Sequence, residues 1–152
     1  MVNKIFDCGH ILDHLKQEHR VVLELCYRIR IGLLHGVQIK RIKIYTDLFY
    51  HEYLKPHFEL EEKYIFTVFE KDNLLVKRAV SEHKRLKRLF ENNGNIEESL
   101  SLIEEVLESH VRFEEHVLFL NLKERMENRS IVFIMPELPD VSFEWPDTFW
   151  VH

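Results

Sequence analysis

Apolar side chains recur at steps of three and four residues along four stretches of the chain, the spacing that places them on one face of an α-helix. The first stretch predicts a helix that begins near residues 10–13 and continues to about Leu34. Gly32 and Gly36 are expected to weaken and then end it. Its apolar face comprises Leu12, Leu15, His19, Val22, Leu23 and Cys26. A histidine therefore lies inside the apolar stripe.

The second stretch predicts a helix from about Gln38 to Lys71. Pro56 lies in its middle, where the missing N–H and the ring should kink or interrupt the helix one residue before His57. The expected inner face comprises Ile42, Tyr45, Phe49, Tyr53, His57, Leu60, Glu61, Tyr64 and Val68. A histidine and a glutamate therefore share this face with apolar residues.

The third helix is expected to follow a cap at Asp72 or Asn73 and to end at about Glu91. The fourth should follow a cap at Asn95 and end at about Glu127. The expected inner face of the third helix comprises Val76, Ala79, Val80, His83, Leu86 and Phe90. That of the fourth comprises Leu100, Ile103, Leu107, His110, Glu114, Val117 and Leu120 or Asn121. Both helices again carry a histidine among apolar residues.

The last residues, 130–152, have a different composition. They contain three prolines, which argue against a helix, and the aromatic residues Phe143, Trp145, Phe149 and Trp150. We expect an extended tail packed over residues 1–129, because so much aromatic surface is unfavourable in water. An arm that binds a partner or forms a dimer is the alternative. The expected fold is all-α, an antiparallel up-down four-helix bundle with an extended aromatic C-terminal tail.

Composition narrows the function classes. The chain has 152 residues, of which 45% are hydrophobic and 31% charged, as in one ordinary soluble domain. The net charge is −5 and no basic stripe is present, which argues against nucleic acid as a partner. No apolar run is long enough for a membrane span. Two cysteines without a Cys-x-x-Cys pattern predict neither a disulfide framework nor a thiolate zinc site, so we expect a cytoplasmic protein.

A ten-residue pattern occurs twice, at 57–66 and at 110–119, and reads His-x-x-(Leu/Phe)-Glu-Glu-(Lys/His)-x-(Ile/Leu)-Phe. On a helix, His57 and Glu61 lie one turn apart on one face, as do His110 and Glu114. A single copy is explained by a partly buried His–Glu hydrogen bond. Two copies, both beside apolar faces, favour a shared metal cluster, because an uncompensated buried charge is costly.

The two halves of the chain also match at the other helices, where Glu18-His19-Arg20 corresponds to Glu82-His83-Lys84. Imidazole with carboxylate suits iron, manganese or zinc, and six ligands suit two metals better than one. We expect the two histidines of each half to share one metal and the glutamates, with a bridging oxygen, to join the two metals. The expected ligands are His19, His57, Glu61, His83, His110 and Glu114.

Other residues near the pattern receive simpler interpretations. Glu62 and Glu115 point about 100° away from the bridging pair and should be solvated or hydrogen-bonded to a ligand. His14 and His116 fall on wetter helix faces. Tyr53 either belongs to the core or donates a hydrogen bond to a bound oxygen species. The chain lacks the Glu-x-x-His motif of ferritin-like bundles.

With this ordered set of histidines and glutamates, the chain resembles the hemerythrin or HHE cation-binding domain family over roughly residues 10–125. The resemblance implies a non-heme di-iron centre with an oxo or hydroxo bridge, and binding of or response to O2, nitric oxide or iron. Two departures from the invertebrate oxygen carriers concern Lys87, where those proteins have a further histidine, and Glu114, which follows His110 at four residues rather than five. The missing histidine implies an additional open coordination position, which favours reaction over reversible storage of O2.

These features predict a metal-binding protein that binds or senses O2 or a related diatomic molecule such as nitric oxide. The alternatives are a di-iron enzyme or repair protein acting on nitric oxide, peroxide or iron–sulfur clusters, and an iron store or donor. Manganese or zinc could replace iron in the same ligand set. Monomer and dimer, the latter with contact through residues 130–152, both remain open.

Overall fold

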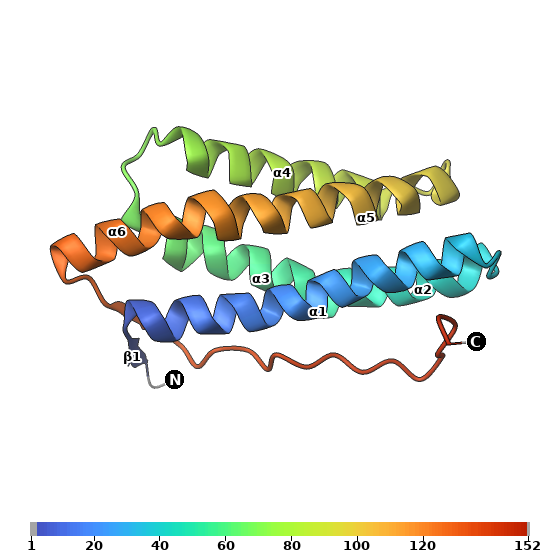
Figure 1. Ribbon diagram of the computed structural model, residues 1–152, viewed down its shortest axis with the longest axis horizontal. Coiled ribbons are helices and arrows are strands. Elements are labelled where there is room, and N and C mark those ends of the chain that lie inside the picture. Colours follow the sequence, from blue (N-terminus) through green and yellow to red (C-terminus); the bar gives the residue numbers. More distant parts are fainter. Residues whose placement is uncertain (1–2, 152) are drawn as a thin grey trace.

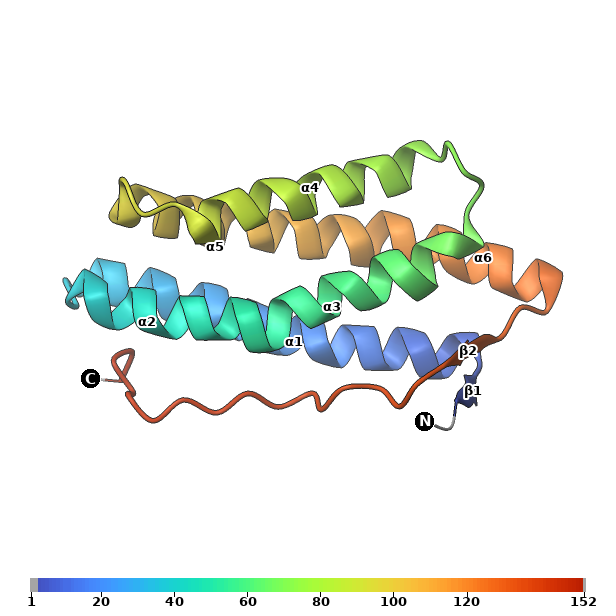
Figure 2. The same ribbon diagram turned by 180° about the vertical axis from the view of Figure 1, so that it is seen from behind.

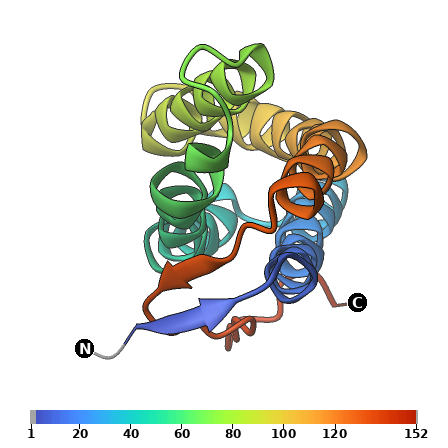
Figure 3. The ribbon, with the colours of Figure 1, turned by 90° about the vertical axis from the view of Figure 1, so that its left-hand side faces the viewer.

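The computed structural model describes residues 3–151, and their fold is a four-helix bundle with a two-stranded sheet at one end (Figures 1 and 3). The helical elements are α1 (Cys8–Leu34), α2 (Ile39–Phe49), η1 (Tyr50–Leu54), α3 (Lys55–Leu60), η2 (Glu61–Ile65), η3 (Phe66–Val68), α4 (Leu74–Glu91), α5 (Ile96–Phe113), η4 (Glu114–Leu118) and α6 (Phe119–Arg129). The strands are β1 (Lys4–Phe6) and β2 (Phe133–Met135). The elements α2 to η3 form the second rod and α5 to α6 the fourth, which confirms the expected bundle.

Side-chain caps define where the rods begin. The Asp7 carboxylate accepts a hydrogen bond from the His10 amide at 2.8 Å, so α1 begins at Cys8, slightly earlier than expected. Asn73 accepts from two amides at the start of α4, and Asn95 accepts from the Glu98 amide at the start of α5. Both asparagine caps were expected, because their side chains satisfy amides that a helix N-terminus leaves unpaired.

The second rod passes Pro56 without a break. Immediately before it, the wider π-helical turn η1 bonds the Lys55 amide to the Tyr50 carbonyl, and the helix then resumes as α3. A π-turn is a common way to accommodate an irregularity in a helix and is frequent at functional sites. The rod ends at Val68 rather than near Lys71, because Phe69 is already extended.

Two more π-turns, η2 and η4, occur at equivalent places in the repeated pattern, and they shift the buried face by one residue. After Glu114, the buried positions are Leu118, Phe119 and Leu122, whereas Val117 and Leu120, expected inside, are 39% and 62% exposed. In the second rod Ile65 is buried, and Tyr64, expected inside, is only partly so. The expectation failed there because regular α-helical spacing does not hold across an inserted residue.

Gly32 does not interrupt α1 and lies buried inside the helix. A β-carbon at this position would lie 2.8 Å from Ile42 Cδ1 and 3.0 Å from Phe149 Cε1. The glycine therefore allows α2 and the C-terminal segment to approach α1 closely. The helix ends at Leu34, as expected, and Gly36 follows it with a φ of 67°, which suits a residue without a side chain.

Residues 130–151, the C-terminal tail, leave the bundle through β2 and then run extended along α1 and α2 (Figures 1 and 2). The antiparallel pairing of β2 with β1, with Ile134 opposite Ile5, was not expected from the sequence. Further along, the Tyr53 hydroxyl donates to the Val141 carbonyl at 2.9 Å, and Asp147 pairs with Arg41 at 2.6 Å. The tail aromatics surround Tyr45, with ring-centroid distances of 5.5–6.1 Å to Phe143, Trp145, Phe149 and Trp150.

Two hydrophobic clusters fill the bundle. One lies towards the ends of the rods near Phe90 and Leu100, and the other towards the sheet, where it includes Phe6, Phe119 and Met126. Along each rod, the histidines of the expected metal site fall between residues of the two clusters. Within residues 3–151, no helix combines the length and hydropathy needed to cross a bilayer.

The close approach at Gly32 gives a stability prediction. Gly32→Ala should lower the melting temperature, because two contacts of 2.8 and 3.0 Å would have to open. Overpacking of this kind costs on the order of 2 kcal/mol, against the roughly 1 kcal/mol that alanine gains in helix propensity. Gly9→Ala is the control, since a β-carbon there meets its nearest neighbour at 3.7 Å. Thermal unfolding of both variants, followed by circular dichroism, measures the difference. A Gly32→Ala protein as stable as the control would contradict this account.

Candidate metal centre

The structure brings all six expected ligand residues together in the middle of the bundle, and we call them the His/Glu cluster. Each rod contributes at least one member: His19 comes from α1, His57 and Glu61 from α3 and the start of η2, His83 from α4, and His110 and Glu114 from α5 and the start of η4. None of the six exceeds 4% exposure, and both glutamates are at 0%. Such burial of two acids requires compensating partners.

The cluster divides into two overlapping groups, each able to hold one metal ion. One group comprises His19, His57, Glu61 and Glu114, and the other comprises Glu61, His83, His110 and Glu114. Within each group, one ligand atom per residue lies within 4.8 Å of every other. Both glutamates belong to both groups, so each could serve a cation in either group. The histidines divide between the groups as the helix order suggested.

Single carboxylate oxygens lie between imidazoles of the two groups. Glu114 Oε1 is 3.3 Å from His19 Nε2 and 3.0 Å from His110 Nε2. Glu61 Oε1 is 3.4 Å from His57 Nε2 and 3.2 Å from His83 Nε2. The two glutamates therefore occupy equivalent positions, related by the approximate two-fold repeat of the sequence.

The inward-facing atoms of the cluster are left without hydrogen bonds. Among residues 3–151, the Nε2 atoms of His19, His83 and His110 and both carboxylate oxygens of Glu61 and Glu114 are buried and have no hydrogen-bond partner. Leaving one buried polar group unsatisfied costs about 1–3 kcal/mol. Cations coordinated between these atoms would satisfy all of them, so the residues present fit the two-metal site that the ligand set implies.

The opposite nitrogen of every cluster histidine contacts a further carboxylate. These pairs join His19 Nδ1 to Glu115 at 2.7 Å, His57 Nδ1 to Glu18 at 3.2 Å, His83 Nδ1 to Glu62 at 2.7 Å and His110 Nδ1 to Glu82 at 2.7 Å. An imidazole that donates its Nδ1–H in this way keeps Nε2 free as a metal ligand with fixed orientation. Six carboxylates thus surround four imidazoles, an environment that attracts cations.

Glu62 and Glu115 contact histidines of the His/Glu cluster, one of the two roles expected for them. The corresponding role of Glu18 and Glu82 was missed. A signal was present, because each precedes a cluster histidine in the repeated Glu-His dipeptide. Each of these glutamates reaches the histidine of the next rod along the chain rather than its own neighbour.

The π-turns η2 and η4 explain how consecutive glutamates serve the same site. Glu61 and Glu114 begin these turns, and their carbonyls accept bonds from the amides five residues later. A wider turn reduces the angle between successive side chains below the roughly 100° of an α-helix. Glu61 and Glu114, the first glutamate of each pair, therefore point into the centre of the cluster. Glu62 and Glu115, the second, contact the outward nitrogen of a cluster histidine.

Three other expectations are settled by burial and contacts. Tyr53 lies in the core, and its hydroxyl donates to the tail rather than towards the cluster. His116 is exposed as expected, but His14 is largely buried, with Nε2 at 3.2 Å from Glu18 Oε1. Lys87, which stands where oxygen carriers have a further histidine, is exposed and does not belong to either group.

Burial and mutual proximity perturb the acids and bases of the cluster. Burial, followed by the charge of Glu114, raises the pKa of Glu61 well above its usual range. Burial alone would also raise the pKa of Glu114, but the adjacent His110 lowers it well below normal. Burial disfavours charged His110, yet the charge of Glu114 outweighs this and raises the pKa of His110 to about 9. Without metal, protons therefore take over part of the charge compensation.

A four-helix bundle with two overlapping buried groups of histidine and glutamate defines a cation-binding helical protein. The chain belongs to the hemerythrin family, because the model of the hemerythrin HHE cation-binding domain matches residues 10–119. Comparison with curated proteins and with solved structures gave no match.

The raised pKa of His110 gives a pH prediction for the metal-free protein. The folded state holds this proton up to pH about 9, whereas the ordinary histidine pKa is 6.5, so the stability it contributes is present below pH 6.5 and is lost as pH rises towards 9. The raised pKa of Glu61 acts in the same direction. The melting temperature should fall by roughly 10 °C across this window.

Differential scanning calorimetry of chelator-treated protein, at several pH values, measures this slope. His110→Gln is the control, because glutamine cannot take up the proton, and its slope should be flatter. A metal-free melting temperature that rises between pH 6.5 and 9 would show that His110 is not held protonated by Glu114.

Proposed function

We propose that the His/Glu cluster holds two iron ions as a non-heme di-iron centre, and that the protein binds or senses O2 or a related diatomic molecule such as nitric oxide. The observation that carries the proposal is the sharing of Glu61 and Glu114 by both groups. Two separate mononuclear sites would not need common carboxylates. A shared pair suits ions that act together.

The donor set supports iron over several other metals. Each group offers two imidazole nitrogens and two carboxylates and contains no thiolate, whereas calcium and magnesium prefer oxygen ligands throughout. Manganese and zinc accept similar donors, so the choice of iron rests on family membership together with the paired arrangement. When bound, two adjacent irons supply the redox chemistry with which a diatomic ligand can react.

The protein residues orient the ligands and keep water out. The four Nδ1–carboxylate contacts fix the plane of each imidazole. Aromatic rings cover two of them: Phe58 stacks on His83 with a centroid distance of 3.9 Å, and Phe119 lies parallel to His19 at 5.4 Å. An apolar surround of this kind lowers the local dielectric and limits competition by water.

Open coordination positions support a binding or reacting role. Each group contains four residues, fewer than the six ligands of an octahedral ion. The exposed Lys87 side chain does not belong to either group, so the further histidine of oxygen carriers has no replacement here. This specific feature also supports the second candidate, a di-iron enzyme or repair protein acting on nitric oxide or peroxide.

Metal content tests the bridging assignment. After anaerobic reconstitution with iron, the wild type should contain about two ions, and Glu61→Ala or Glu114→Ala should lose at least one, because each removes a carboxylate common to both groups. Glu62→Ala and Glu115→Ala should keep both ions and bind them about 10–100-fold more weakly, as expected when the partner of a ligand histidine is removed.

Elemental analysis and chelator competition distinguish these outcomes, with the exposed Glu59→Ala as the matched control. Full loading of Glu114→Ala with loss in Glu115→Ala would reverse the assignment at the second copy of the pattern. A wild type that retains no more than one ion would remove the di-iron proposal.

Optical spectra separate binding from catalysis. The reduced iron-loaded protein should develop a new absorption band on exposure to O2 or nitric oxide, because open coordination positions admit the ligand. The zinc-loaded protein is the control and should show no such band, since zinc has no redox chemistry. A stable, reversible band supports binding or sensing, and continued consumption of peroxide or nitric oxide supports the enzyme. An unchanged spectrum with every gas would exclude both.

A further inference from the structure

Every member of the His/Glu cluster is at least 96% buried, so a metal ion must cross protein to reach it. A buried metal site requires a path from solvent, and the surface around the cluster offers openings of different charge. An uptake route for the ions rests on the proposed metal-binding function.

The first opening lies beside His83, between α3 and α4. Its lining includes His83 and Phe58, but also Lys55, Lys84 and Lys87. Within residues 3–151, none of these lysines forms an ion pair. Glu59 and Glu62 also line this pocket, so its three lysines leave a net positive charge of one. This charge disfavours a divalent cation, because the potential of the lining controls which ions accumulate there.

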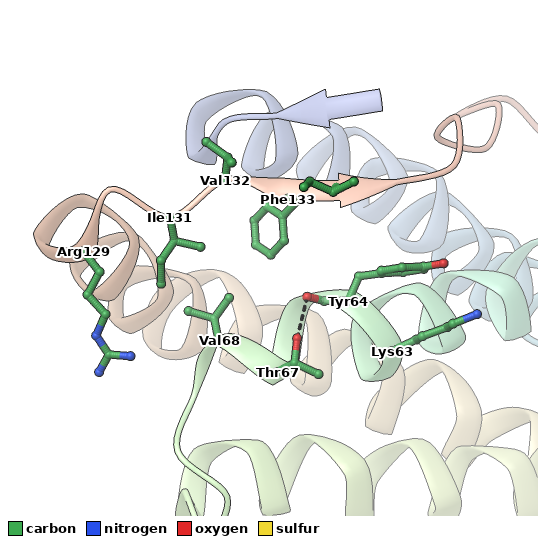
Figure 4. Close-up of a pocket in the computed structure, with 9 residues that line it drawn as sticks. Lys63, Tyr64, Thr67, Val68, Arg129, Ile131, Val132 and Phe133 are labelled. Carbon is green, nitrogen blue, oxygen red and sulfur yellow. Dashed lines mark hydrogen bonds between the residues drawn. The ribbon is translucent and has the colours of Figure 1, made fainter. Parts of the chain in front are cut away.

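A second opening lies between β2 and the turns η2 and η3 (Figure 4). Tyr64, Val68 and Phe133 line it, and its charged residues are Lys63 and Arg129. It contains no member of the His/Glu cluster. Both its charge and its position therefore make it unsuitable for cation uptake.

The third opening, which we call the α1 pocket, lies between the first turns of α1 and the C-terminal tail. His10, His14 and Gln17 line it together with residues 137–141 of the tail, and Asp13 joins them at its edge. Its volume of about 540 Å³ exceeds that of six waters at roughly 30 Å³ each, so a hydrated ion fits.

The α1 pocket carries metal-binding side chains and acidic charge. His10 and His14 are four residues apart on one helix, the spacing at which two imidazoles can share a metal. Asp13 and Asp140 add carboxylates, and the lining lysine, Lys4, is neutralised by Glu137 at 3.0 Å. Of the three openings, this one attracts divalent cations.

A continuous chain of donor atoms leads inward from this pocket. His14 Nε2 is buried, lacks a hydrogen bond among the described residues, and lies 3.2 Å from Glu18 Oε1. The same Glu18 oxygen lies 3.2 Å from His57 Nδ1, and the Glu18 side chain is only 2% exposed. Glu18 therefore touches both a wall of the pocket and a member of the cluster.

We propose that His10, His14 and Glu18 form the uptake route by which a divalent transition-metal ion, such as ferrous iron, reaches the His/Glu cluster. The ion binds first to His10 and His14 and then passes along His14 and Glu18 to the group that contains His57. His10 and His14 offer two imidazoles at the surface, whereas each group of the cluster offers four buried ligand residues, so the ion is released inward. The tail forms the outer wall of the pocket and supplies Asp140.

Metal uptake kinetics test the route. Metal-free protein is mixed anaerobically with Co²⁺ or Fe²⁺ in a stopped-flow instrument, and the absorbance of the bound metal is followed. The double variant His10→Ala/His14→Ala should load about tenfold more slowly than wild type, since charged and ligating surfaces raise local ion concentration by at least that factor. His51→Ala, which removes an exposed histidine remote from the α1 pocket, should load at the wild-type rate.

The final metal content distinguishes a role in metal uptake from a role in binding the metal at the cluster. The double variant should still reach two ions per chain and the wild-type holo melting temperature. Wild-type kinetics in the double variant would overturn the route, and so would a lower final stoichiometry, which would make His14 part of the site itself. Faster loading of Lys84→Glu/Lys87→Glu, with no effect at His10 and His14, would assign uptake to the His83 side. A wild type that takes up no metal at all would instead reject the proposed function.

Discussion

The burial of Glu61 and Glu114 at the centre of the bundle is the constraint on which the rest of the structure depends. Two acids at zero exposure are tolerated only with close positive or hydrogen-bonding partners. The four imidazoles provide part of this compensation, and each is held by an outer carboxylate. The consequence is a cluster that is rich in negative charge and complete only when cations, or protons in their absence, occupy it.

The repeated pattern made the cluster predictable, because the same residue types recur at helical spacing on all four rods. What regular spacing could not predict was the effect of the π-turns. Each inserts a residue at Glu61 or Glu114 and moves the buried face from Tyr64 to Ile65 and from Val117 to Leu118. The adjacent glutamates in both copies were therefore visible in the sequence, but the backbone that lets both serve one site was not.

Features that depend on contacts between distant parts of the chain could not be predicted from the sequence either. The pairing of Ile5 with Ile134 joins strands of only three residues each, too short for an alternating pattern to identify. Gly32 was expected only to weaken its helix, whereas the short distances to Ile42 and Phe149 show that it allows close packing. The spacing of apolar residues predicts helices and their buried faces. The course of an extended tail depends instead on its contacts with residues far away in the sequence.

The two halves of the His/Glu cluster are alike, but the surface pockets beside them differ in charge. Inside, the two groups share both glutamates and each has two histidines with outer carboxylates. Outside, the pocket beside His83 is lined by three lysines and two glutamates. On the His57 side, Glu18 and His14 lead to a pocket that Glu137 and Asp140 of the tail help to line. Because electrostatic potential acts over a Debye length of about 10 Å, these shells act differently on approaching ions. The internally repeated cluster therefore has a more acidic opening on the His57 side and a more basic one on the His83 side, a difference that the repeat alone would not produce.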